Sequence, residues 1–174
     1  RMDKLKKDGE LNDRLRESMP LLRDSFFSKL VNGKFASEGS VASKAGFLGL
    51  DLSARQYAVV ILELHNGAGG DEYDRNLIRY AVMDLCREAF SGSYVCHCFS
   101  LEDKIGLLVC AGELDLGKVR GVCTAIRDEM NGRLGIPVTI GIGKPQQGTL
   151  SIQHSYREAV EALEYKILMG LNRV

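Results

Sequence analysis

The feature that most constrains the fold is a nearly continuous apolar run at residues 57–65, Tyr-Ala-Val-Val-Ile-Leu-Glu-Leu-His. A strand covered on one face alternates apolar and polar side chains, whereas a run without alternation is typical of a strand buried on both faces. A glycine-rich stretch from Gly67 to Gly70 follows and ends the run. We therefore expect a central strand whose sheet is covered by helices on both sides.

Periodicity predicts further elements on either side of this strand. Apolar residues recur every three or four positions in one segment before this strand and three after it, which we expect to be helices: 36–49, 71–90, 116–130 and 151–169. Short β-prone runs predict a hairpin and a last strand: 94–99, 105–110 and 137–143. A helix between two strands favours a parallel crossover, while a hairpin is antiparallel. The prediction is an α+β fold, a mixed β-sheet flanked by helices.

The N-terminal part, residues 1–33, is expected to be a helical arm preceding a domain at 34–174. Apolar side chains recur at helical spacing from Leu11 onward, but Pro20 interrupts the pattern. Since proline is tolerated in a first helical turn, Ser18 is a candidate N-cap of a second helix beginning at Met19 or Pro20. Gly33 is then expected to end this helix.

One stripe of the arm could serve as a dimerisation seam, made of Leu11, Leu15, Leu22 and Phe26. An arm projecting from a domain has no other place to bury the first two leucines. The alternative is that the stripe from Leu22 to Leu30 folds back onto the domain's own sheet. A homodimer is therefore an expectation that depends on which of the two arrangements forms.

Composition excludes several classes of function. The 23 basic residues balance 23 acidic ones, so this segment is not expected to hold DNA or an anionic membrane by itself. No apolar run of about 18 residues is present, so no membrane span is expected. The five cysteines lack Cys-x-x-Cys spacing, which favours reduced thiols in a cytoplasmic protein. Strand alternation would place His97 opposite Cys96 and Cys98, so we expect no metal site and no cofactor.

The string Gly69-Gly70-Asp71-Glu72-Tyr73 differs by one aromatic residue from the GGDEF signature of diguanylate cyclases. In that family the signature occupies the turn of a β-hairpin, where its glycines let nucleotide phosphates approach and its acid binds metal. Here the string lies between a strand and a helix, where acidic residues favour a helix N-terminus. We therefore interpret it as a turn and a helix cap.

Other parts of the chain nonetheless resemble the GGDEF fold. The closing residues 170–174, Gly-Leu-Asn-Arg-Val, are similar to the Gly-x-Asn-Arg-Val pattern that ends the cyclases, and residues 139–143 are similar to the strand before it. When the chain is aligned on its hairpin, the signature falls on residues 101–104. Leu101 and Glu102 then replace the glycine pair, and Lys104 replaces the metal-binding acid.

The same alignment implies that the cyclase activity is lost. The metal-binding acid of the first strand corresponds to Glu63, and the phosphate-contacting lysine of the last helix corresponds to Ile167. The segment that holds the base in cyclases is reduced to the few residues between His65 and Asp71. Phosphoryl transfer depends on metals and positive groups that offset charge. The resemblance therefore implies the GGDEF fold without an enzyme.

A closer resemblance covers almost the whole chain. Residues 16–33, 48–52 and 155–165 are similar to the central region of AraC-type two-component response regulators. These bacterial transcription factors place a degenerate GGDEF-like domain between a receiver and a pair of helix-turn-helix domains. The resemblance implies a non-catalytic regulatory domain whose partners are those flanking domains, with DNA bound only through the helix-turn-helix pair.

Two other functions stay open from the sequence. A vestigial cyclase groove near Glu63, His65, Asn66 and the turn residue Asp103 could bind a small molecule or a nucleotide, which would make the domain a sensor. An active diguanylate cyclase is the third hypothesis. These four residues are our candidate ligand site.

Overall fold

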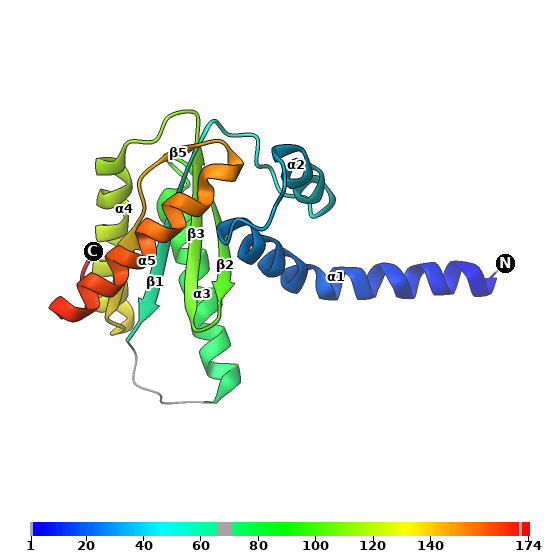
Figure 1. Cartoon of the computed structure of the whole chain (residues 1–174). Helices are drawn as coiled ribbons and strands as arrows, with labels where there is room; N and C mark the ends of the chain where they lie inside the picture. Colours follow the sequence, from blue (N-terminus) through cyan, green and yellow to red (C-terminus); the bar gives the residue numbers. More distant parts are fainter. Residues whose placement is uncertain (1, 66–70, 171) are drawn as a thin grey trace.

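The computed structural model describes residues 2–65, 71–170 and 172–174, in which one β-sheet carries helices on both faces (Figure 1). The elements of this part of the chain, in order, are α1 (Met2–Val31), α2 (Glu38–Phe47), β1 (Gln56–Leu64), α3 (Glu72–Phe90), β2 (Val95–Leu101), β3 (Lys104–Ala111), α4 (Leu116–Glu129), the π-helical turn η1 (Met130–Leu134), β4 (Val138–Ile142), β5 (Gln146–Gln147), the 3₁₀ turn η2 (Thr149–Ser151) and α5 (Ile152–Met169). The predicted α+β class is confirmed, and among the described helices none is long and apolar enough to cross a membrane.

The strands follow the order β2-β3-β1-β4, and β5 pairs with the start of β1. Each pair of neighbours in the described sheet is antiparallel. The two strands joined by α3, β1 and β2, do run parallel, as a crossover predicts, but β3 lies between them. The expectation of a mixed sheet with parallel neighbours is therefore wrong in this respect, because the hairpin inserts its second strand beside β1.

Strand β1 separates two hydrophobic cores. Its even-numbered residues 58–62 are buried against α3 and α4, and its odd-numbered residues 57–61 are buried against α1, α2 and α5. Both sets are almost inaccessible to solvent. The central strand covered on both faces, predicted from its unbroken apolar run, is confirmed.

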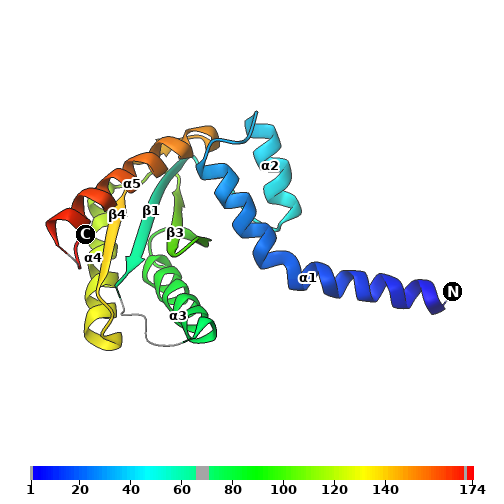
Figure 2. The same ribbon diagram turned by 60° about the horizontal axis from the view of Figure 1, so that its bottom comes forward.

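The first helix is continuous across Pro20, so the expected break and the N-cap at Ser18 are wrong. A proline inside a helix removes the hydrogen bond to the carbonyl four residues earlier, here that of Arg16, which is exposed and open to water. The helix axis changes direction between the two halves of α1 (Figure 2), as expected beside a proline. Gly33, with a φ of 68°, follows the last turn as predicted.

The C-terminal half of α1 belongs to the core of the domain. Phe26 and Phe27 are each 2% exposed, and the Phe27 ring stacks on that of Phe99 in β2, with the centroids 4.7 Å apart. At the edge of β2, the backbone N–H of Ser100 donates a hydrogen bond to Asp24 Oδ1 at 3.0 Å. Phe26 is thus buried in its own chain, and the expectation that it forms part of a dimer seam is wrong.

The N-terminal half of α1 extends away from the sheet (Figure 1). Leu11 is 58% exposed and Leu15 is 41% exposed, whereas Leu22 is half-buried against the core. The arm therefore divides between the two arrangements that its sequence left open. Only its first half keeps an uncovered apolar stripe.

Gly141 of β4 and Gly143, one residue after the end of β4, explain why α5 lies so close to the sheet. A Cβ at Gly141 would collide with the carbonyl oxygen of Ala159, and a Cβ at Gly143 would collide with that of Ser155. In this contact, Ser155 Oγ accepts a hydrogen bond from the backbone N–H of Val59 at 2.8 Å. These glycines are required by helix packing.

Candidate functional site

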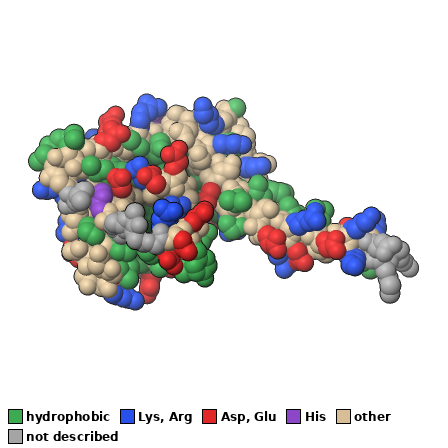
Figure 3. Space-filling model, turned by 90° about the horizontal axis from the view of Figure 1, so that it is seen from below, with side chains coloured by type: hydrophobic (Ala, Val, Ile, Leu, Met, Phe, Trp, Pro, Cys, Tyr) green, Lys and Arg blue, Asp and Glu red, His purple; other side chains and the backbone are tan. Residues whose placement is uncertain are grey.

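A cavity of about 420 Å³ lies where β1 ends, between the tip of the β2–β3 hairpin, the last turns of α1, and α5. Figure 3 looks onto this end of the molecule, where acidic side chains gather. The cavity coincides with the position that the sequence predicts for a vestigial cyclase groove. Apolar side chains from β1 and α5 form part of its wall, among them Ile61 and Leu163.

Glu63 contributes a carboxylate from β1 to this cavity. The residue pairs with Thr139 of β4 and is the first polar side chain on the strand after the buried run. Its Oε2 atom is buried and has no hydrogen-bond partner among the described residues. Glu63 therefore lines the cavity with a half-buried carboxylate, one of whose oxygens is costly to leave unpaired.

The hairpin tip contributes charges of both signs. Leu101 pairs with Lys104, so Glu102 and Asp103 form the turn. Glu102 has a φ of 53°, a left-handed conformation that is uncommon for a residue other than glycine. The backbone thus keeps a glycine-like conformation at a position that aligns with the glycine pair of the cyclase signature.

The side chains of Glu102 and Lys104 line the cavity, while Asp103 is not among the described residues that do. Asp103 instead accepts a contact from Lys104 Nζ at 3.3 Å. This ion pair is partly exposed, so it contributes little to stability. Asp103 acts on the cavity only through Lys104.

The remaining polar wall comes from two helices. Ser28 and Asn32 belong to the last turns of α1 and its end, while Tyr156 and Glu164 belong to α5. Among the described residues, the charged lining consists of three carboxylates, from residues 63, 102 and 164, and one ammonium group, from residue 104, which gives these residues a formal charge of −2. The arrangement favours a ligand that carries positive charge.

His65 lies beside the cavity but is engaged elsewhere. Its Nε2 is 2.8 Å from Thr139 Oγ1, and the same oxygen accepts a hydrogen bond from the backbone N–H of Asn172 at 3.2 Å. His65 is not among the described residues that line the cavity. The structure therefore connects this histidine to the C-terminal tail.

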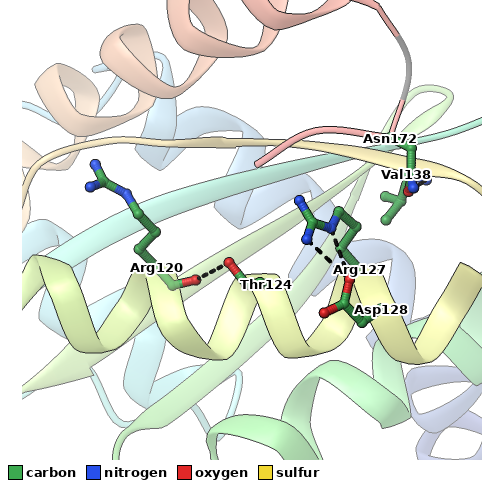
Figure 4. A network of polar contacts seen from close by, with 6 residues as sticks. All are labelled: Arg120, Thr124, Arg127, Asp128, Val138 and Asn172. Atoms are coloured by element: carbon green, nitrogen blue, oxygen red, sulfur yellow. Dashed lines mark hydrogen bonds and ion pairs between the residues drawn. The ribbon is translucent and has the colours of Figure 1, made fainter.

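The C-terminal tail, residues 172–174 with the sequence Asn-Arg-Val, forms hydrogen bonds with β4. Asn172 Oδ1 accepts a hydrogen bond from the backbone N–H of Val138 at 3.2 Å (Figure 4). The carbonyl of Arg173 accepts another from the N–H of Ile140 at 2.8 Å. These bonds cover the outer edge of β4, which would otherwise expose unpaired backbone groups.

The sequence-predicted site residues are thus only partly brought together. Glu63 lines the cavity, His65 and Asp103 are not among the described residues that line it, and Asn66 lies outside the described residues. Sequence reasoning missed Ser28 and Asn32, because nothing in a local pattern indicates that the end of α1 reaches the end of β1. Their spacing of four residues, which places both on one side of a helix, is the only signal that the sequence held.

Two residues that the resemblance to cyclases singles out, Lys104 and Ile167, both line the cavity. Lys104 contributes an ammonium group there, and Ile167 contributes an apolar side chain. The neighbouring Lys166 donates to the carbonyl of Ile140 at 3.2 Å. Burial, together with the nearby Arg120, lowers the pKa of Lys166.

The short string that resembles the GGDEF signature has a structural role where it is described. The side chain of Asp71 accepts a hydrogen bond from the backbone N–H of Asp74 at 2.9 Å and so caps α3. Gly69 and Gly70 lie outside the described residues. The predicted helix cap is confirmed for the acidic part of the string.

Comparison with known proteins places this fold in a family. Residues 32–165, most of the chain, match the family described as GGDEF-like domain. Among solved structures, the diguanylate cyclase SiaD from Pseudomonas aeruginosa, in complex with its activator SiaC, has a similar fold with a TM-score of 0.53 and 15% sequence identity, covering 99% of this chain and 71% of that chain. No curated protein matches the sequence. With a family match over most of its length and the sheet topology described above, this chain belongs to the GGDEF-like domains.

Proposed function

We propose that this chain is a non-catalytic regulatory domain of an AraC-type two-component transcription regulator. In this proposal, residues 1–33 form the linker and dimerisation helix, and residues 34–174 form a degenerate GGDEF-like domain. The hairpin tip carries the proposal. There, Lys104 places a positive charge beside Glu63, at a position where phosphoryl transfer would need a bound metal ion.

The other cavity residues support the loss of activity. A pair of metal ions needs several carboxylates, and of the aligned metal-binding positions only Glu63 is acidic. Glu102 projects a further negative group into the cavity from the turn, where glycines would leave space for nucleotide phosphates. A triphosphate would therefore meet carboxylates and too few positive groups.

The regulatory part of the proposal is supported by the arrangement of α1. One half of this helix packs in the domain core and lines the cavity, and the other half projects with Leu11 and Leu15 exposed. A change in the domain can therefore alter the position of the arm. Such a switch needs only a few kcal/mol of difference between two states.

The proposed partners are a second copy of the chain, through the arm, and the receiver and helix-turn-helix domains of the full regulator. The solved SiaD structure contains a protein activator, so a protein of this fold can be regulated by a protein partner. DNA would be bound only by the helix-turn-helix domains. The balanced charge of this chain is consistent with that division.

Catalytic silence is tested by incubating the purified chain with GTP and Mg²⁺ or Mn²⁺ and separating the products by chromatography. We expect no cyclic di-GMP above the level of a heat-denatured control. Product that depends on the metal and disappears in Glu63→Gln would contradict the proposal. It would favour an active cyclase instead.

Self-association is tested by light scattering over a concentration series. We expect a weak dimer that the double substitution of Leu11→Glu with Leu15→Glu dissociates. Leu21→Glu is the matched control, because Leu21 is 73% exposed on the same helix but lies off the stripe. A chain that stays monomeric at high micromolar concentration, or a dimer that survives the double substitution, would refute the role of the arm.

A further inference from the structure

We propose that the cavity at the end of β1 binds a small organic cation, an amine or guanidinium compound with a short hydrocarbon part. The inference rests on the proposed function in one respect, namely that this groove no longer serves a nucleotide. It adds a ligand class and a regulatory input to the domain. Charge, an unpaired buried acceptor, the shape of the cavity and its contact with α1 all support it.

The charge of the lining selects against anions. Glu63, Glu102 and Glu164 face the cavity from three different elements, β1, the hairpin and α5. Lys104, which supplies the one ammonium group in the described part of the lining, is already paired with Asp103 at 3.3 Å. A phosphate or carboxylate ligand would meet like charges, whereas a cation would meet complementary ones.

The carboxylate of Glu63 indicates where in the cavity the positive group would lie. Its Oε2 atom is buried and accepts no hydrogen bond from the described residues. A buried carboxylate oxygen without a donor is unfavourable, and a charged N–H donor forms the strongest hydrogen bond to it. An ammonium or guanidinium group that approaches the Glu63 carboxylate from the cavity would give this carboxylate a charged donor and neutralise its charge.

The rest of the cavity suits a short hydrocarbon chain. Its volume of about 420 Å³ falls in the range of small-molecule sites. Ile61, Val160, Leu163 and Ile167 give it an apolar wall from β1 and α5. Polar atoms at one side and methyl groups at the other fit a ligand that is charged at one or both ends and apolar between them.

The cavity also contacts the helix that continues into the arm. Ser28, in the C-terminal half of α1 that packs on the domain (the docked half), lines the cavity together with Asn32, which directly follows this helix. Asn32 Nδ2 donates a hydrogen bond to the carbonyl of Ser28 at 2.7 Å, so the two residues are held together. A ligand that touches both residues stabilises the docked position of α1. Occupancy of the cavity would therefore shift the arm, which connects ligand binding to dimer geometry.

The experiment uses thermal unfolding and isothermal titration calorimetry of the whole chain with defined probes. Agmatine and spermidine are the cationic probes, 1,4-butanediol is the neutral probe, and GTP with Mg²⁺ and Mg²⁺ alone are the competing ligands. We expect a rise in Tm and measurable heat with at least one cationic probe and neither with butanediol. The affinity should fall with added NaCl, because exposed charges are screened.

Variants locate the site. Glu63→Gln and Glu164→Gln keep the shape of the side chain and should each weaken binding of the cationic probe by about tenfold or more, as expected for the loss of a charged hydrogen-bond partner. The control is Glu161→Gln, an exposed carboxylate of α5 outside the cavity, which should bind as the parent does. Circular dichroism checks that each variant is folded.

Three outcomes would overturn the inference: no response to either cationic probe at millimolar concentration, equal binding by the Glu63→Gln variant, or a response to Mg²⁺ alone that Glu63→Gln abolishes. None of these affects the proposed function unless cyclic di-GMP is also formed from GTP. Formation of that product overturns the proposed function whatever the amine titration shows. The two hypotheses therefore fail separately.

Discussion

The two halves of α1 belong to one continuous helix and carry the same apolar stripe, yet the domain covers only the second half. Phe26 is 2% exposed, whereas Leu11 is 58% exposed. The difference is one of surroundings, since the second half meets β2 and α5 while the first extends beyond them (Figure 1). An amphipathic stripe thus predicts a helix with an apolar face, but it does not predict what covers that face.

The largest expected effect comes from the docked half. Phe26→Ala removes a ring that lies 5.3 Å from Phe27 and 5.4 Å from Phe35, centroid to centroid. Loss of a fully buried aromatic side chain costs about 3–5 kcal/mol, so the free energy of unfolding in urea should fall by that amount. A loss below about 1 kcal/mol would mean that the second half is not packed as described.

The hydrogen bond at the edge of β2 should have a smaller effect. Asp24→Ala leaves the N–H of Ser100 without its acceptor and should lower the free energy of unfolding by about 0.5–1.5 kcal/mol. Asp24→Asn keeps an acceptor oxygen and serves as the control. Partial burial raises the pKa of Asp24, so ionisation of this carboxyl is less favourable in the folded state than in the unfolded chain. Asp24→Asn should therefore unfold no earlier than the parent at neutral pH, and an equal loss in both variants would show that the hydrogen bond is not the cause.

A pH-dependent effect should appear where His97 meets the docked half. The His97 ring lies 5.9 Å from that of Phe27, and burial lowers its pKa from 6.5, although Nε2 approaches the carbonyl of Asp51 at 3.2 Å. With a folded pKa below the unfolded one, protonation favours unfolding. Stability is therefore complete above about pH 6.5 and declines as the pH falls below it. Comparison of Tm between the parent and His97→Gln over this range isolates the effect, and parallel curves would contradict it.

The smallest effect is expected in the projecting half. Leu15→Ala should change the free energy of unfolding by no more than about 0.5 kcal/mol, measured at concentrations where the chain is monomeric, because the side chain is largely exposed. It thereby forms a matched pair with Phe26→Ala. A loss as large as that of Phe26→Ala would show that both halves are packed on the domain in solution.

Much of the fold could be predicted because its determinants are local. The unbroken apolar run at 57–62, the cap at Asp71 and the termination at Gly33 each depend on neighbours within a few residues. The errors have two origins. One is local: Pro20 is predicted to end a helix that continues across it, because the carbonyl left without a donor is exposed to water. The others concern contacts between distant segments: β3 lies where a parallel neighbour of β1 is predicted, and Phe26 packs in the core of its own domain.

The candidate site also combines a residue that the local sequence pattern identifies with residues that only the tertiary structure brings to it. Glu63 could be identified because alternation along β1 determines its face and the end of the strand determines its depth. Ser28, Glu102 and Glu164 join it from elements that are far apart in the chain, and no spacing in the sequence predicts that they surround one cavity. Asp103, chosen for its place in the hairpin turn, contacts Lys104 instead of the cavity.

Periodicity, capping residues and glycine positions were enough to place the helices and strands and to relate the chain to the GGDEF fold, since each of these signals depends on backbone geometry within a few residues. Which half of α1 is buried was settled by contacts such as Asp24 with Ser100 and Phe27 with Phe99, which join residues more than 70 positions apart. The charge of the cavity was settled likewise, because electrostatic complementarity depends on distance in space and is independent of separation along the chain.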